Sequence, residues 1–303
     1  MSKDEIKYER RIVAFIDILG FKEIVKQSEQ DTTKMELLYS VFDFLKIWET
    51  SDKWDLKFVE IEEDAQKKGI GNFDIRGKTN TTSFSDSIVV SVKVASNVNE
   101  MTSTLIANLA YIGAFLIEKG ILFRGGVTIG NIIHNENGTV FGQALIDAYQ
   151  LETKSAKYPR IVLSDKLIKE LNYPINSKRN RYPYHQYINR FSDGFIGFHQ
   201  MIHYQVIESW TEMTSEKLTS RLANVRKTII EGLDNSFENP DVFKKYKWLK
   251  KQYNNLIILR DFNFNDKTDG NIKMKIRNLN DVISGQNIHY SFTDKFYNER
   301  RKK

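Results

Sequence analysis

The hydrophobic and polar positions of this chain form blocks that predict strands and helices in a definite order. Residues 11–18 (RIVAFIDI) are an apolar, β-branched run typical of a buried strand. Residues 81–94 alternate between polar and apolar side chains and predict a β-hairpin with Ser85 and Asp86 at or near its turn. Residues 121–133 and 161–164 predict two further strands.

Apolar residues spaced three and four positions apart predict the helices. The clearest stripes lie in residues 34–48 and 99–119, residues 140–152 predict a short loop leading into a helix, and residues 165–171 predict another helix. Two of the strands follow each other directly, without a helix between them. This order predicts an α+β fold with a ferredoxin-like βαββαβ core rather than a doubly wound sheet.

The chain changes character at Asn172, where a polar, aromatic and turn-rich stretch begins. Helical patterns return at residues 215–235 and 240–256. We therefore expect two regions. Residues 1–171 form the core, and residues 172–303 form a mostly helical C-terminal extension that packs on the core or on a partner subunit.

Composition narrows the class of protein. Of the 303 residues 41% are hydrophobic, enough for a sizeable core, and the absence of cysteine excludes disulfides, thiolate metal sites and a cysteine nucleophile. The longest apolar runs fall short of the ~20 residues of a membrane span, and the N-terminal segment resembles no signal peptide. We expect a cytoplasmic protein with no membrane contact.

The net charge of +6 is unevenly distributed. Residues 240–303 hold 15 Lys and Arg against 7 Asp and Glu, whereas the rest of the chain holds 30 against 32. Because a nucleic-acid-binding body is usually basic throughout, we expect no nucleic acid as partner.

Two carboxylates stand among apolar residues of predicted strands, Asp17 in FIDI and Asp86 in FSDSIVV. A buried carboxylate is costly unless it is paired or binds a metal ion. The first strand and the central hairpin are neighbours in a βαββαβ core, so these two side chains can converge. Hard oxygen ligands favour Mg²⁺ or Mn²⁺, and two such ions form the usual clamp for phosphoryl transfer. The alternative is that Asp17 caps the next helix and Asp86 forms an Asx-turn.

Two glycine-containing segments are candidate phosphate contacts. Leu19, Gly20 and Phe21 lie between a strand and a helix, where backbone N–H groups attract anions, although Gly20 is equally consistent with a plain tight turn. Arg124, followed by two glycines, can hold a phosphate in a bidentate manner or form a surface ion pair. The paired glycines indicate close approach by a ligand or by another backbone.

Taken together, these segments resemble the class III nucleotide cyclase family, and among its members the pyrimidine nucleotide cyclases of the Pycsar antiphage systems most. The resemblance covers about residues 11–171, just over half the chain. It rests on FIDILGF (15–21), FSDSIVV (84–90), RGGVTIG (124–130), VFGQALIDAYQLE (140–152) and PRIVLS (159–164).

The resemblance implies a particular activity and site. Asp17 and Asp86 match the metal ligands, Ile18 matches the residue that lends a backbone carbonyl to a metal, and Leu19 to Phe21 match the phosphate-facing turn. The resemblance further implies two Mn²⁺ or Mg²⁺ ions per site and a homodimer with sites at its interface. The reaction that it implies is cyclisation of UTP or CTP. The cyclic UMP or cyclic CMP product would activate a separate effector during phage infection, without direct contact between the proteins.

Four departures from the family pattern refine this expectation. Thr82 stands at the position of the purine-reading Lys and Thr139 at that of its partner Asp, which argues against a purine substrate. Ile146 replaces the ribose-orienting Asn, and Gln150 replaces the Arg that stabilises the transition state. Arg124 could supply the missing positive charge instead. The alternatives are an inactive nucleotide sensor of the same fold and a two-metal polymerase or nuclease palm.

Overall fold

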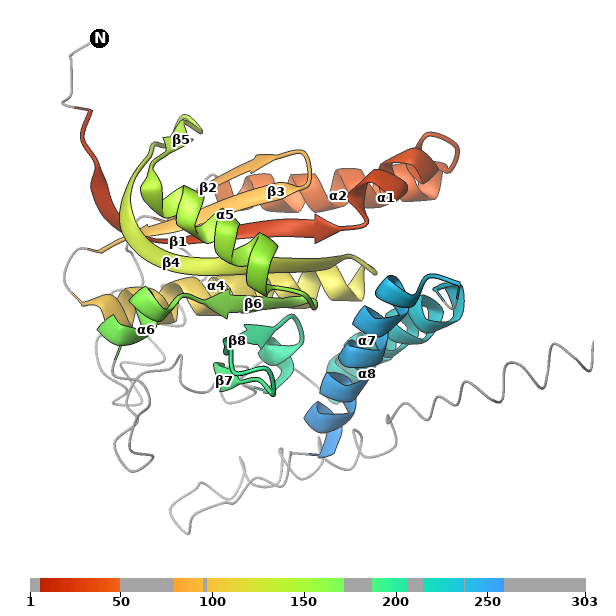
Figure 1. The fold of residues 1–303 in the computed structure, drawn as a ribbon. Coiled ribbons are helices and arrows are strands. Elements are labelled where there is room, and N and C mark those ends of the chain that lie inside the picture. Colours follow the sequence, from red (N-terminus) through yellow and green to blue (C-terminus); the bar gives the residue numbers. More distant parts are fainter. Residues whose placement is uncertain are drawn as a thin grey trace, which may run out of the picture. The chain divides into compact units, whose positions relative to one another are not determined.

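The computed structural model of the protein describes residues 6–49, 79–94, 97–171, 187–205, 215–236 and 238–258 (Figure 1). The chain divides into two compact units. Unit 1 comprises Met1–Ile117 and Ile121–Val206, and unit 2 comprises Glu118–Gly120 and Ile207–Lys303. The sheet and all candidate site residues belong to unit 1.

In the described part of the chain, unit 1 forms an eight-stranded sheet with helices on both faces. Its strands are β1 (Glu9–Leu19), β2 (Thr79–Phe84), β3 (Ser87–Lys93), β4 (Leu122–His134), β5 (Val140–Phe141), β6 (Arg160–Leu163), β7 (Asn189–Arg190) and β8 (Ile196–His199). Its helices are α1 (Phe21–Ser28), α2 (Thr32–Glu49), α4 (Val98–Glu118), α5 (Gln143–Ser155) and α6 (Asp165–Glu170), with a 3₁₀ turn at Ile202–Gln205.

The strand order confirms the predicted α+β fold class. The sheet runs β2-β3-β1-β4-β6-β8-β7, with β5 paired to β4. Strands β2, β3, β1 and β4 are antiparallel neighbours, and helices connect β1 to β2 and β3 to β4. This is the ferredoxin-like βαββαβ arrangement. Strand β6 then joins β4 in parallel.

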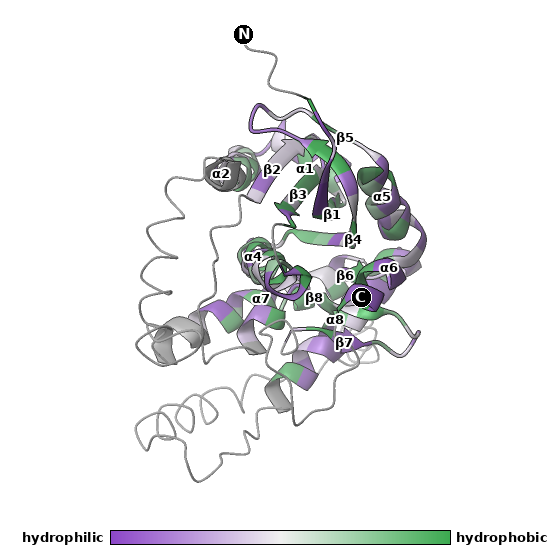
Figure 2. Cartoon of the chain, turned by 90° about the vertical axis from the view of Figure 1, so that its left-hand side faces the viewer, coloured by the Kyte–Doolittle hydropathy of each residue, from purple (hydrophilic) through white to green (hydrophobic). Residues whose placement is uncertain are grey.

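Alternation along β1 assigns its side chains to two different cores. Ile12, Ala14 and Ile16 pack with α4 in the larger cluster, and Val13 and Phe15 pack under α5 in a smaller one. In Figure 1 α5 lies in front of the sheet and α4 behind it, and Figure 2 shows the two helices on opposite sides of largely hydrophobic strands. Asp17 continues the row of Val13 and Phe15, and therefore points to the α5 face.

Helix α4 is long and apolar enough to cross a membrane by length and composition alone. However, 78% of its most apolar 18-residue window is buried inside the fold. Leu105, Leu109, Ile112 and Leu116, the predicted apolar stripe, are all fully buried in the larger cluster. The helix is the principal core helix of unit 1.

The paired glycines after Arg124 let backbones approach one another. A Cβ on Gly126 would lie 2.5 Å from the carbonyl oxygen of Ala148 on α5, and one on Gly125 would lie 2.7 Å from the carbonyl oxygen of Phe15 on β1. Of the two explanations offered by the sequence, close approach of another backbone is therefore the one observed. This close approach lets α5 pack directly on β4.

Strands β5, β7 and β8 were not predicted. The last two form a hairpin whose β8 pairs with β6, so the sheet continues past residue 171. Arg160 on β6, only 1% exposed, makes two bonds to Asp193 in the turn of this hairpin, at 2.9 and 2.5 Å. The domain boundary at residue 171 stays a prediction.

Unit 2 contains α7 (Ser215–Asn235) and α8 (Pro240–Ile258), close to the helices predicted there. Leu222, Val225 and Ile229 of α7 and Leu249 and Tyr253 of α8 are fully buried. Gly232 lets the helices pack closely, because a Cβ there would overlap the Tyr246 ring. Residues 187–205 of the predicted extension belong to unit 1, and residues 172–186, 206–214, 237 and 259–303 lie outside the described residues.

Candidate functional site

The structure brings Asp17 and Asp86 together at one end of the sheet. Asp17 is the ninth residue of β1 and pairs with Ser87, the first residue of β3. Asp86 lies in the two-residue turn between β2 and β3, where Ser85 has a positive φ of 57°. The backbone N–H of Ile18 donates a 2.8 Å hydrogen bond to the carbonyl oxygen of Asp86, which ties the hairpin turn to the end of β1.

Around Asp17 we define the acid–arginine cluster of Asp17, Arg124 and Glu152. Arg124 lies opposite Asp17 on β4, with its Nε 3.2 Å from the Asp17 carboxylate and 2.5 Å from Glu152 Oε1. The side chains of Asp17 and Arg124 are 23% and 26% exposed, whereas Glu152 is only 2% exposed. Arg124 thus forms a half-buried ion pair here.

Sequence reasoning missed Glu152. Ala144, Ala148 and Glu152 are the buried residues of α5, spaced four apart along the face that packs on β4. That spacing on a small-residue stripe is the signal that could have found it. Burial raises the pKa of Glu152, and the negative charges of Asp17 and Asp86 raise it further, while Thr153 and Arg124 act in the opposite direction. All three acids therefore share one electrostatic environment.

The donor chemistry at this end of the sheet fits a divalent cation. Asp17 offers a carboxylate from β1, Asp86 offers one from the adjacent hairpin turn, and the neighbouring Ile18 offers a backbone carbonyl, all hard ligands that suit Mg²⁺ or Mn²⁺. Within the described ranges no three His, Asp or Glu side chains form a group that could hold a metal ion. Backbone or substrate oxygens would have to complete the coordination.

The strand-to-helix turn after β1 is built around Gly20, whose φ of 74° lies in the left-handed region. The Gly20 carbonyl accepts from the N–H groups of Glu23 and Ile24 at 3.0 and 3.1 Å, which opens α1. A Cβ at Gly20 would meet nothing within 4 Å, so space borders this turn. Leu19 ends β1, and the Phe21 ring packs edge-on against Phe42 of α2. Phe21 can therefore face a phosphate with its backbone but not with its ring.

Thr82, a candidate base contact on β2, lies against the loop between β4 and β5, which also contains the second candidate, Thr139. Thr82 Oγ1 lies 3.0 Å from His134 Nε2 and 3.5 Å from the carbonyl oxygen of Gly138. Thr139 follows in the loop, is exposed, and donates its backbone N–H to the side chain of Asn137 at 3.1 Å. Ile146 and Gln150 are both exposed on α5.

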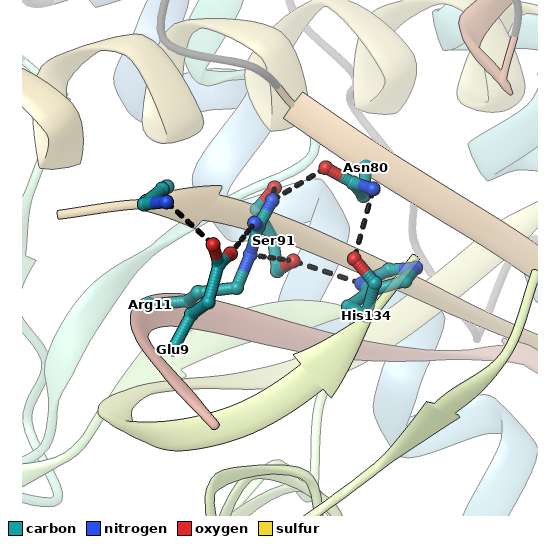
Figure 3. A network of polar contacts seen from close by, with 6 residues as sticks. Glu9, Arg11, Asn80, Ser91 and His134 are labelled. Carbon is teal, nitrogen blue, oxygen red and sulfur yellow. Dashed lines mark hydrogen bonds and ion pairs between the residues drawn. The ribbon is translucent and has the colours of Figure 1, made fainter. Parts of the chain in front are cut away.

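A second group that sequence reasoning missed is a polar network on the α5 face of the sheet, made of Glu9, Arg11, Asn80, Ser91 and His134 (Figure 3). Arg11 is 3% exposed and His134 is 4% exposed. Burial and the nearby Arg11 lower the pKa of His134 to about 4. His134 is therefore neutral near pH 7, and its Nε2 lies beside the hydroxyl of Thr82.

The solved structures that are similar to this chain include two guanylyl cyclases. The guanylyl cyclase Cya2 has 15% identity and a TM-score of 0.32, with 54% of this chain and 78% of that chain covered. The catalytic core of a rhodopsin-guanylyl cyclase with converted specificity, in complex with ATPαS, has 15% identity and a TM-score of 0.34, with 63% and 94% covered. No model of a known protein family and no curated protein matches the chain.

Proposed function

We propose that this protein is a class III nucleotide cyclase that converts UTP into cyclic UMP and pyrophosphate. The observation that carries the proposal is the meeting of Asp17 and Asp86, tied by the 2.8 Å bond between Ile18 N–H and the Asp86 carbonyl. The end of β1 that holds Asp17 and is tied to Asp86 leads through the Gly20 turn into α1, within a βαββαβ sheet. These are the parts that cation-assisted transfer of a phosphoryl group requires.

The proposed reaction is an intramolecular displacement. The ribose 3′ oxygen bonds the α-phosphorus, the bond from that phosphorus to the bridging oxygen breaks, pyrophosphate leaves with the oxygen, and the 3′ proton passes to solvent. When bound, Mn²⁺ or Mg²⁺ supplies positive charge to the phosphate oxygens and lowers the pKa of the 3′ hydroxyl. Asp17, Asp86 and the Ile18 carbonyl would hold the cations, and the backbone of Leu19, Gly20 and Phe21 would face the phosphates.

Arg124 is the proposed substitute for the transition-state arginine that is absent at Gln150. Its guanidinium already lies beside Asp17, held there by the buried Glu152 at 2.5 Å. A fixed positive charge next to the phosphates stabilises negative charge that develops during transfer. In this scheme Arg124 touches the substrate and Glu152 is a positioning residue.

The substrate class follows from the base-reading positions. Two short hydroxyl side chains, Thr82 and Thr139, stand where purine-specific relatives carry Lys and Asp. A pocket that hydrogen-bonds its base rejects bases that leave its polar groups unpaired. We therefore propose a pyrimidine substrate, with UTP favoured and CTP, giving cyclic CMP, as the alternative.

The assembly that we propose is a homodimer with sites at its interface, whose product activates a separate antiphage effector without direct contact. Exposed apolar side chains on and beside α5 support the dimer, since Ile146 is 49% and Tyr149 51% exposed. The effector relationship rests on the resemblance to Pycsar cyclases alone.

A nucleotide sensor without turnover is the second candidate function. The observation that favours it is that α5 presents Ile146 and Gln150, neither of which can orient a ribose as Asn does or carry a positive charge as Arg does. A sensor would bind the nucleotide at the same place and leave it unchanged.

The test is to incubate purified protein with each of the four NTPs and Mn²⁺ and to identify the products by mass. A cyclase yields cyclic UMP and pyrophosphate in equal amounts. Binding of UTP without any product indicates the sensor instead. If the protein neither binds nor converts any NTP, both functions are wrong.

A further inference from the structure

Four residues form a continuous chain of hydrogen bonds from a buried cation to the candidate base contact. Arg11 Nε lies 2.8 Å from Ser91 Oγ, Ser91 Oγ lies 2.8 Å from His134 Nδ1, and His134 Nε2 lies 3.0 Å from Thr82 Oγ1. We call Arg11, Ser91, His134 and Thr82 the Arg11–Thr82 relay. Figure 3 shows its first three members, with Asn80 alongside.

The Arg11 end fixes the direction of this chain. A guanidinium only donates, so the Ser91 oxygen accepts from Arg11 and its own proton must go elsewhere. Ser91 is fully buried, and within the described part of the chain the acceptor at its hydroxyl is His134 Nδ1. A buried hydroxyl left without an acceptor would cost free energy. Nδ1 is therefore the unprotonated nitrogen, and Nε2 carries the proton.

The Thr82 end gives the same direction independently. A backbone carbonyl only accepts, so Thr82 donates its hydroxyl proton toward the Gly138 oxygen, 3.5 Å away. Its oxygen then accepts from His134 Nε2–H. At 3.5 Å the bond to Gly138 is long and weak, and an incoming acceptor can replace it. Thr82 is half-buried on β2, the strand at one edge of the described sheet, so a ligand can reach it.

Neighbouring groups lock the relay in this state. Asn80 accepts from Arg11 Nη2 at 2.6 Å and donates to the His134 carbonyl at 2.9 Å, so the histidine backbone is also held. Burial, together with the charge of Arg11, keeps the His134 ring neutral. A protonated ring would donate at both nitrogens and leave Ser91 facing two donors.

We propose that the Arg11–Thr82 relay holds the Thr82 hydroxyl as an outward hydrogen-bond donor, and that Thr82 thereby selects a base with a carbonyl acceptor, uracil, over one with an amino group, cytosine. Pyrimidines differ at ring position 4, where uracil has a carbonyl oxygen and cytosine an amino donor. The inference deepens the proposed function and rests on it, because it takes Thr82 to face the base.

The expected preference is about tenfold in kcat/KM for UTP over CTP, which corresponds to one neutral hydrogen bond of ~1.4 kcal/mol. Exclusion is not expected. The Thr82 oxygen keeps one lone pair after accepting from His134, so the amino group of cytosine retains a weaker way to bind.

The first part of the test measures the relay without any substrate. Nitrogen-15 NMR of histidine-labelled protein reports which imidazole nitrogen carries the proton, and His134→Gln assigns the signal among the five histidines. The proposal requires a neutral ring protonated at Nε2. Protonation at Nδ1 would reverse the relay, turn Thr82 into an acceptor and overturn the proposal.

The second part compares kcat/KM for UTP and CTP in the wild type, Thr82→Val and Thr81→Val. Thr82→Val keeps the side-chain shape and should reduce the ratio from about ten to about one. Thr81→Val is the matched control one residue away, since its buried hydroxyl has no hydrogen-bond partner among the described residues and it lies on the opposite face of β2. It should leave the ratio unchanged.

The outcomes separate the two proposals. Turnover of CTP as fast as UTP by the wild type, or an unchanged ratio in Thr82→Val, contradicts the relay inference and leaves the cyclase standing. If Thr82→Val fails to fold, the wild-type ratio of kcat/KM for UTP and CTP and the protonated nitrogen of His134 still test the relay inference. Absence of turnover with all four NTPs contradicts the cyclase, and base selection by Thr82 falls with it.

Discussion

The side chains of the site are arranged around one arginine. Arg124 contacts Asp17 at 3.2 Å and Glu152 at 2.5 Å, and Glu152 is almost completely buried. A buried carboxylate is tolerated only with a counter-ion, so Arg124 is required for stability as well as proposed for transfer. In the proposed scheme, a cation bound at Asp17 would leave Arg124 paired with Glu152 and next to the substrate phosphates.

Replacement of Arg124 by Ala should destabilise the protein by about 2 kcal/mol. That value is below the ~3–5 kcal/mol of a fully buried pair because Arg124 is 26% exposed. Urea unfolding measures the loss. The double variant Arg124→Ala/Glu152→Ala should regain part of it, since no buried charge is then left unpaired. A double variant that loses the sum of both single effects would contradict this account of the pair.

The sequence predicted part of this site and missed the rest for a physical reason. Asp17, Asp86 and Gly20 sit at ends of predicted elements, and local patterns locate such positions. Glu152, Arg11 and His134 each have a partner far away in the chain, which is Arg124 for Glu152 and Ser91 for both Arg11 and His134. Nothing local distinguishes Arg11 and His134 from surface polar residues, and the only local signal for Glu152 is its spacing from Ala144 and Ala148. Only the register of β1, β3 and β4 reveals the pairs.

At the scale of elements, the packing of α5 on β4 positions the acid–arginine cluster. Gly126 lies under the backbone of α5, where a Cβ would approach Ala148 O to 2.5 Å and Glu152 N to 2.9 Å. The helix therefore cannot keep its place if this glycine gains a side chain.

Gly126→Ala should cost about 3 kcal/mol, the upper range for overpacking, because backbone atoms and not side-chain tips block the added methyl. Gly130→Ala is the matched control on the same strand. Its Cβ would meet the flexible Lys166 Nζ at 3.1 Å and Ala144 Cβ at 3.2 Å, so about 1 kcal/mol or less is expected. Chemical denaturation of both variants measures their free energies of unfolding. Equal losses of stability would contradict the claim that Gly126 is needed for α5 to pack on β4.

The β7–β8 hairpin depends on a different charge pair. Arg160 is buried, binds Asp193 through two nitrogens and lies over the Tyr158, Phe191 and Phe195 rings at 4.7 to 5.6 Å. Its hydrogen bond to Asp193, opposed by partial burial, lowers the pKa of that carboxyl below 3.8. The local sequence is polar and turn-rich, which is why the strands were not predicted.

Acidification should weaken this hairpin. An Asp with a depressed folded pKa stabilises the fold above its unfolded pKa, and this contribution is lost as pH falls through the folded pKa. The melting temperature of the wild type should therefore fall more steeply below pH 4 than that of Asp193→Asn. Asp241→Asn, whose carboxylate is 87% exposed on α8, should leave the slope unchanged. Parallel wild-type and Asp193→Asn curves would contradict the role of the pair.

At the scale of the whole molecule, the order of elements in the core was predictable because each strand and helix has a strong periodic pattern. The antiparallel order β2-β3-β1-β4 then follows from the βαββαβ succession. Strands β5 and β7, of two residues each, have no period to detect. They exist because neighbouring elements present a pairing edge.

The proposed homodimer gives a further prediction. Tyr8, Phe141, Ile146 and Tyr149 are 46–57% exposed, and the last three lie on β5 and α5. Ile146→Lys should shift the mass measured by light scattering toward the monomer. Tyr39→Lys is the control, because Tyr39 is 74% exposed on α2. A wild type that is monomeric at all concentrations would refute the dimer.

The central claim is that Asp17 and Asp86 act together on one bound nucleotide. Its most direct test is UTP turnover with Mn²⁺ in Asp17→Asn, Asp86→Asn and the double variant, with Asp165→Asn, an exposed residue of α6, as control. Each single variant should lose at least about 100-fold, equivalent to ~3 kcal/mol, and the double variant little more. Asp165→Asn should match the wild type. Turnover near the wild-type rate in either single variant would contradict the account.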